Sequence, residues 1–301
     1  MVFDRRLLAH RRHRFAMVAA DHDFLLQRVA DDFFERLAII KREFPVGVNL
    51  GAHHGVLTPV LGELPNVGRI IDVDGVWPLL CQSGGGDRLR VLADEEALPF
   101  ADGSLDLVVS GLSLHHVNDL PGCFVQIRRA LKPDGLFLGA ILGGRTLEEL
   151  RMAWLRAEAE LTGGSSPRVA PFGDVRDFGG LLQRAGFGLP VVDSDVVTVT
   201  YETPFALMAE IKAMGASNAL AERRRVPVTR RLMQRAAEIY AEEFSQSDGR
   251  VRATFEILTL TAWSPHDSQQ KPLKPGSAAA RLADALGTIE QPAGDKAGGG
   301  T

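Results

Sequence analysis

The stretch VNLGAHHGVL, residues Val48 to Leu57, decides the fold class. An apolar run enters a tight turn at Gly51 and leaves it at Gly55 into residues that suit a helix, as in strand-loop-helix cradles for phosphates and nucleotides. The middle of the loop, however, reads AHH. Because the central glycine of such a loop lets a ligand lie against bare backbone, the imidazole of His53 is expected to crowd the ligand.

Strand-like and helix-like segments alternate after this loop. Apolar runs such as RIIDVDG and LDLVVSGLSLHHV are separated by stretches such as LPGCFVQIRRALKPDG, which has a helical apolar pattern and a Pro-Asp-Gly stop. Apolar strands that alternate with helices predict a parallel sheet covered on both faces. The predicted fold class is therefore α/β and Rossmann-like.

Three regions are expected along the chain. Residues 1–45 contain FLLQRVADDFFERLAIIKREF, whose apolar positions recur at helical spacing, so they predict an N-terminal helical segment. Residues 46–265 are expected to form the main domain, with two long helices around 204–244 inserted as a cap over the site. Residues 266–301 turn to QQKPLKPGS and AGDKAGGGT, whose low apolar content predicts a flexible tail.

Composition argues against several classes of protein. The chain has 301 residues, 45% of them apolar, and a net charge of −4, which is typical of a soluble globular protein. No apolar run reaches the roughly 20 residues of a membrane-spanning helix, and the N-terminus lacks a secretory signal, so a cytoplasmic location and no integral membrane segment are predicted. The acidic balance argues against nucleic-acid binding, and the arginine clusters at 5–14 and 223–235 are expected to be solvated faces. Cys81 and Cys123 lack the spacing of metal ligands.

The end of the second predicted strand offers two carboxylates. Open parallel sheets bind ligands at the carboxyl ends of their strands. Asp72 or Asp74 could therefore bind the ribose hydroxyls of a nucleotide, since both follow the Gly51 loop by about 20 residues.

The string VLADEEALPFADGSLDLVVSGLSLHHVNDLP, followed by RRALKPDGLFLGAILGGRTLEELR, resembles the family of mitochondrial respiratory complex I assembly factor 5. The similarity extends from VFDR at Val2 to GSA at Gly276, and the order of elements is similar to the class I methyltransferase fold. The resemblance implies a seven-stranded, mostly parallel sheet with S-adenosylmethionine as the cofactor. It also implies hydroxylation of an arginine in a complex I subunit, the protein partner.

The resemblance also implies roles for individual residues. It favours Asp74 over Asp72 for the ribose, and it places Asp94 and Glu95 at the adenine amino group. Ser110 and His115 fall where related enzymes present groups to the cofactor and substrate, so His115 is the candidate catalytic residue.

Two residues depart from the pattern of the family. Relatives normally carry an acid in place of Asn49 and a glycine in place of His53, so the chain lacks both the charge that holds the cofactor's amino group and room for its methionine part. Binding of S-adenosylmethionine is therefore expected to be weakened or lost. Restoring both residues, Asn49→Asp with His53→Gly, is predicted to tighten it by about tenfold or more.

Three functions stay open on this reasoning. The chain could be an arginine hydroxylase of complex I assembly, an ordinary methyltransferase similar to the malonyl-carrier-protein O-methyltransferases, or a non-catalytic chaperone that has lost the cofactor. The pairs His53-His54 and His115-His116, with Asp74, also match the ligand set of non-haem iron oxygenases. Adjacent side chains diverge, however, so no metal site is predicted.

Overall fold

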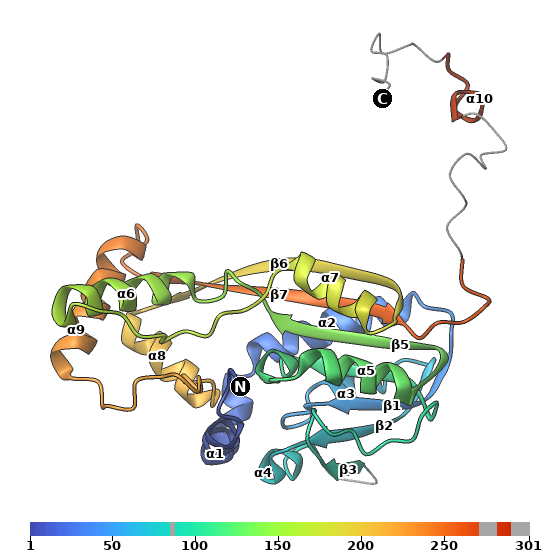
Figure 1. Ribbon diagram of the computed structural model, residues 1–301, viewed down its shortest axis with the longest axis horizontal. Coiled ribbons are helices and arrows are strands. Elements are labelled where there is room, and N and C mark those ends of the chain that lie inside the picture. Colours follow the sequence, from blue (N-terminus) through green and yellow to red (C-terminus); the bar gives the residue numbers. More distant parts are fainter. Residues whose placement is uncertain (85–87, 271–281, 290–301) are drawn as a thin grey trace, which may run out of the picture. The chain divides into compact units, whose positions relative to one another are not determined.

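The computed structural model describes residues 1–84, 88–270 and 282–289 of the chain (Figure 1). The chain divides into two compact units, Met1–His266 and Asp267–Thr301. The first unit holds the N-terminal helices, the main domain and the expected cap together, and the second contains helix α10, Leu282–Leu286. Much of the expected tail, 266–301, lies outside the described residues, so its flexibility stays a prediction.

Seven strands form one sheet in the order β3-β2-β1-β4-β5-β7-β6. All neighbouring pairs from β3 to β5 are parallel, whereas β7 runs antiparallel to both β5 and β6. The predicted α/β fold of the class I methyltransferase type is thereby confirmed. The strands are β1 Phe44–Leu50, β2 Val67–Asp74, β3 Leu89–Leu92, β4 Leu105–Gly111, β5 Leu131–Leu142, β6 Gly188–Tyr201 and β7 Val251–Trp263.

The strand order reverses between β1 and β4, and this switch point marks where a ligand site is expected. These two strands lie side by side, with Val48 paired to Val108 and Asn49 to Val109. Every residue of β4 is buried, because its near-continuous apolar run is covered on both faces of the sheet. The loops that follow β1 and β4 therefore emerge together at the carboxyl edge of the sheet, where this class of fold binds ligands.

Helices cover both faces of the sheet (Figure 1). On one face, α2 buries Val29, Phe33 and Leu37 together with residues of the short helix α3. On the other face, α5 buries Phe124 and Ile127 together with residues of α7. These helices span α2 Phe24–Ala38, α3 Leu57–Leu61, α5 Leu120–Ala130 and α7 Val175–Arg184.

Helices α8, Pro204–Ala213, and α9, Arg230–Phe244, stand between the last two strands of the chain, where the sequence places a cap. Helix α6, Glu148–Thr162, packs against α9 (Figure 1) and is joined to it by ion pairs, Arg156 with Glu243 and Arg235 with Glu160. The cap helices thus form one layer with α6, and their role as a lid stays a prediction.

Four further elements complete the carboxyl edge of the sheet. Helix α1, Arg5–Phe15, continues into the 3-10 turn η1, Ala16–His22, and both contact the short helix α4, Trp77–Leu80. The 3-10 turn η2, Leu114–His116, follows β4. Within the described parts of the chain, no helix combines the length and the apolar composition needed to cross a bilayer.

Candidate functional site

The loop Gly51–Gly55 keeps the backbone path of a glycine-rich cradle. Gly51 and Gly55 have φ angles of +68° and +81°, in the left-handed region that favours glycine. His53 lies in the same region, with φ +53°. The loop therefore retains the glycine conformation at its centre but carries an imidazole there.

Asn49 belongs to a buried polar cluster beneath this loop. It has no exposed surface, and its Nδ2 donates to Asp72 Oδ1 at 3.0 Å and to Thr58 Oγ1 at 3.2 Å. The Thr58 hydroxyl donates to the same Asp72 oxygen, and burial raises the pKa of Asp72. The side chain at position 49 therefore faces Asp72, and the expectation that an acid there would meet the cofactor's ammonium stays a prediction.

Asp74 fixes the loop through backbone hydrogen bonds. It is fully buried, and its two carboxylate oxygens accept from the N–H groups of Val76 at 2.8 Å and His53 at 2.9 Å. Burial raises the pKa of Asp74, while the charge of Arg12 opposes that shift. Asp74 thus lies at the end of β2, as the sequence predicts, and holds the loop in place. Its predicted contact with the ribose hydroxyls stays a prediction.

The two acids predicted to contact adenine bind an arginine of α1. Arg5 forms ion pairs with both Asp94 and Glu95. Glu95 is buried and accepts a hydrogen bond from the Ser113 hydroxyl at 2.7 Å, whereas Asp94 is half exposed. A ligand that uses these carboxylates has to compete with Arg5.

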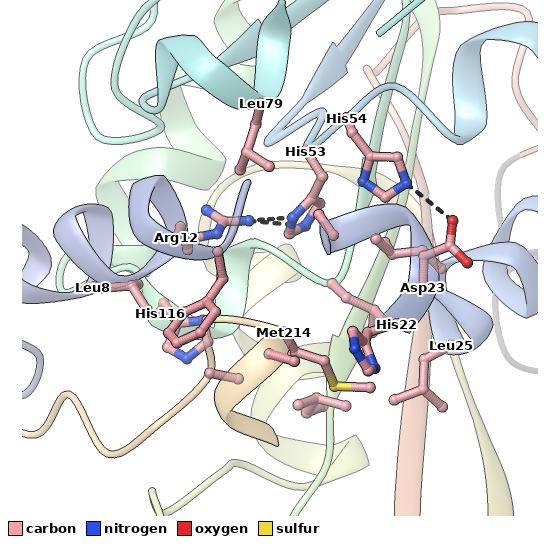
Figure 2. Close-up of a pocket in the computed structure, with 18 of the residues that line it drawn as sticks. Leu8, Arg12, His22, Asp23, Leu25, His53, His54, Leu79, His116 and Met214 are labelled. Atoms are coloured by element: carbon pink, nitrogen blue, oxygen red, sulfur yellow. Dashed lines mark hydrogen bonds and ion pairs between the residues drawn. The ribbon is translucent and has the colours of Figure 1, made fainter. Parts of the chain in front are cut away.

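Arg12, two turns further along α1, contacts the central loop residue (Figure 2). Its Nη2 contacts the Nδ1 of His53 and lies 3.0 Å from the Nε2, and this Nε2 lies 3.1 Å from the carbonyl oxygen of Gly111, which can only accept. These partners fit a neutral ring that carries its proton on Nε2. Burial, with the nearby charge of Arg12, holds the pKa of His53 well below its usual range, so the ring is uncharged at neutral pH.

His115, the candidate catalytic residue, is buried beside a second imidazole. Its ring lies edge-on to Phe172 at 5.5 Å and tilted against His116 at 4.2 Å, between ring centroids. Its Nδ1 has no hydrogen-bond partner among the residues that the structure describes. Burial lowers the pKa of His115 well below its usual range.

Ser110 forms a hydrogen bond between two strands of the sheet. Its hydroxyl is fully buried and donates to the carbonyl oxygen of Leu50 at 2.7 Å, which joins β4 to β1. A hydroxyl engaged in this way has no accessible surface for a cofactor, and the ligand role of Ser110 stays a prediction.

A cavity of about 110 Å³ lies where both histidine pairs approach α1 and the end of α8. Figure 2 shows Arg12 and His53 on one side of it and His116 and Met214 on another. Ligand pockets usually enclose about 300–1,000 Å³. The cavity as it stands therefore holds a few water molecules but no nucleoside.

No group of three or more His, Cys, Asp or Glu side chains in residues 1–84, 88–270 and 282–289 is arranged to hold a metal ion. His54 turns away from His53 and pairs with Asp23 at 3.0 Å (Figure 2), and the oxygens of Asp74 accept backbone hydrogen bonds. The iron-ligand set considered from the sequence is not brought together.

Comparisons with known proteins place this architecture. Residues 48–139 match the methyltransferase domain family. The YcgJ protein from Bacillus subtilis, at 14% identity, superposes with a TM-score of 0.56 over 79% of this chain and 99% of that one, which shows a shared fold. The mitochondrial arginine-hydroxylase NDUFAF5 of Rattus norvegicus is 42% identical over 264 residues, covering 87% of this chain and 76% of the relative. The chain belongs to the NDUFAF5 family.

Other relatives of this NDUFAF5-family chain extend the comparison. The human arginine-hydroxylase NDUFAF5 is 41% identical over 89% of this chain and 77% of the relative. A malonyl-[acyl-carrier protein] O-methyltransferase from Gallionella capsiferriformans is 34% identical over 84% of this chain and 90% of the relative. The chain therefore has relatives named for hydroxylation and relatives named for methyl transfer.

Sequence reasoning missed the two arginines that α1 contributes to the NDUFAF5-family site. The cluster 5–14 is expected from its charge to be a solvated face, yet Arg5 and Arg12 are partly buried against Glu95 and His53. The available signal is their spacing of seven residues, which places both on one face of a helix.

The buried histidines give a test by pH. Below the ordinary histidine pKa of about 6.5, the unfolded chain takes up a proton at His115, whereas the folded chain does not. The free energy of unfolding is therefore undiminished above that pH and falls as the pH drops below it. Between about pH 7.5 and 5.5 we expect the parent to lose about 1 kcal/mol more stability than His115→Phe, measured by urea unfolding.

His10→Phe, the same substitution at an exposed histidine of α1, is the control and is expected to keep the pH dependence of the parent. Buried Asp72 and Asp74, whose pKa values are raised, act with the opposite sign in all three proteins, so comparison with the parent removes their effect. A His115→Phe profile that parallels the parent would mean that His115 charges freely in the folded state.

Proposed function

We propose that this chain acts in the assembly of respiratory complex I and hydroxylates an arginine of a complex I subunit. The observation that carries the proposal is the 42% identity over 87% of the chain to a relative named arginine-hydroxylase NDUFAF5. The relatives are named mitochondrial, so the cytoplasmic location expected from the sequence stays a prediction.

The site supports a methyltransferase fold put to another use. Two features argue against a fit for the methionine part of S-adenosylmethionine: His53 occupies the centre of the loop, and Asn49 faces Asp72. Carboxylates that suit an adenosine remain at the strand ends, but Glu95 binds Arg5 and Asp74 binds the loop backbone. We therefore propose that this chain binds S-adenosylmethionine weakly or not at all, and that its reaction is not methyl transfer from it.

Mass spectrometry of complex I subunits tests the hydroxylation. Cells with the gene are expected to contain an arginine peptide heavier by one oxygen atom, which disappears on deletion and returns when the gene is restored. An identical peptide in the deletion strain would refute the proposal. A subunit that stays modified while complex assembly fails would assign the chain to the chaperone class.

A second candidate function is supported by the 34% identity to a malonyl-[acyl-carrier protein] O-methyltransferase over 84% of this chain. Such an enzyme requires S-adenosylmethionine. Calorimetric titration of the purified protein distinguishes the two, because an absence of binding removes the methyltransferase and leaves the hydroxylase.

Arg5 offers a direct test of the proposed adenosine contacts. Arg5→Ala frees Asp94 and Glu95 from their ion pairs, so we expect adenosine to bind about threefold to tenfold more tightly. Arg6→Ala, an exposed neighbour on the same helix, is the matched control and is expected to leave the affinity unchanged. Unchanged or weaker binding by Arg5→Ala, measured by calorimetry on the folded variant, would show that these acids do not receive the nucleoside.

A further inference from the structure

A cleft of about 890 Å³ opens beside the histidine cavity. Residues of α1, α6 and α8 line it, together with the segment 216–228 that leads toward α9. His116, Leu142 and Met214 line both this cleft and the histidine cavity, so the two spaces meet. The cleft has the size of a ligand site and leads to the candidate catalytic histidine.

The charge of this cleft is opposite to that of the chain. Its described lining includes no aspartate or glutamate, although the chain has a net charge of −4. Six cationic side chains line it: Arg11, Arg168, Lys212, Arg223, Arg224 and Arg225. A concave surface lined by one sign of charge concentrates ligands of the other sign.

Three of these cations are already engaged. Arg168 binds Glu158 at 2.9 Å and stacks over Trp154, with 4.8 Å from its guanidinium carbon to the ring centroid. Arg223 pairs with Asp4 at 3.1 Å, and Arg11 donates to the backbone carbonyl of Ser217 at 2.7 Å.

The other three are available to a partner. Lys212, Arg224 and Arg225 are exposed and form no ion pair within 4.0 Å with the residues that the structure describes. Asp4, which lies near Arg225, is already bound by Arg223. The rim of the cleft thus presents unneutralised positive charge.

The floor of the cleft is apolar. It includes Leu147, Leu150, Met208 and Phe255, which belong to or pack against the buried core, so the floor is firmly held. A ligand that matches both the apolar floor and the positively charged rim has apolar side chains that face the floor and carboxylates that face the rim.

We propose that this basic cleft binds an acidic, amphipathic segment of the protein partner, next to the arginine that is modified. This inference rests on the proposed function, because it takes the substrate to be a protein. The target arginine alone would be repelled by the three unpaired cations of the rim, so acidic residues that flank it have to supply the attraction. The apolar floor lies between these rim cations, where the side chains of a peptide can reach it, and this favours a peptide over a flat lipid surface.

Fluorescence anisotropy on the purified full chain tests the proposal. The probe is a labelled peptide of about 12 alternating glutamates and leucines, and its counterpart has lysine for each glutamate. We expect only the acidic peptide to bind, and its affinity to fall by about tenfold in the double variant Arg224→Glu, Arg225→Glu. The matched control, Arg176→Glu with Arg184→Glu, reverses two exposed charges of α7 outside the cleft and is expected to change the affinity less than about twofold.

Equal binding of both peptides, or equal loss in both double variants, would overturn the proposal, as would binding to phosphatidylserine vesicles without binding to the acidic peptide. Thermal melts check that each variant is folded. The two proposals fail separately. Acidic-peptide binding with no modified arginine in cells refutes the hydroxylation alone, whereas a gene-dependent modified arginine with no peptide preference refutes the cleft alone.

Discussion

Gly51→Ala is expected to lower the free energy of unfolding by more than about 3 kcal/mol, and thereby to leave little folded protein. A Cβ atom at this position would lie 2.1 Å from the Oγ and 2.2 Å from the Cβ of Ser113, and the backbone has φ +68°. Ser113 cannot move aside freely, because its hydroxyl holds buried Glu95. Urea unfolding, or the yield of soluble protein if the variant does not fold, measures the effect.

Gly103→Ala is the matched control for this substitution. Gly103 has nearly the same backbone conformation, φ +63°, but nothing lies within 4 Å of the added Cβ. Gly103→Ala is therefore expected to lower the free energy of unfolding by about 1 kcal/mol, which is the penalty for an alanine in the left-handed conformation. If both variants lose the same stability, the contact between the Gly51 loop and Ser113 is loose and the cradle is not held as described.

Asn49→Asp is expected to cost about 3–5 kcal/mol at neutral pH, because it buries a second carboxylate against Asp72 and removes the amide donor. Burial raises the pKa of Asp72, so the free energy of unfolding decreases as the pH rises and this carboxyl ionises. A second carboxyl at position 49 makes that decrease larger. The deficit is therefore expected to be full at neutral pH and to shrink toward about pH 4, where both carboxyls take up protons. Urea unfolding at several pH values measures it.

The double variant Asn49→Asp, Asp72→Asn separates charge from geometry. It restores one amide and one carboxylate to the same buried site, so we expect it to recover most of the lost stability. The sequence alone predicts instead that Asn49→Asp, with His53→Gly, tightens S-adenosylmethionine binding. A stable Asn49→Asp protein with improved binding would support that view and contradict the orientation of Asn49 found here.

The sheet could be predicted from the sequence because its signal is local. The central strands are near-continuous apolar runs, such as β4 at Leu105–Gly111, and such a run predicts a strand that is buried on both faces. The turns at Gly51 and Gly55 need a left-handed backbone, which glycine indicates directly. The buried strands and the turns therefore match the sequence pattern, because residues close together in the chain determine both.

The site was less predictable because its contacts join distant segments. The sequence places Asp74, Asp94 and His115 at the correct strand ends, but not the partners that engage them. Arg5 reaches Asp94 across 89 positions of the chain, and no local pattern encodes that contact. The direction of a side chain is also hidden: the sequence places Asn49 near the end of the first strand but does not show that it points to Asp72.

The position of β7 has a consequence for the order in which the chain is made. Of the strands that the structure describes, β7 is the last to leave the ribosome, yet it lies between β5 and β6 and pairs with both, from Val251 beside Tyr201 to Trp263 beside Leu136. During synthesis, β5 and the 14-residue β6 each wait with an open edge, which favours pairing with other chains. A premature stop before Val251 would therefore yield aggregating protein and not a smaller folded domain.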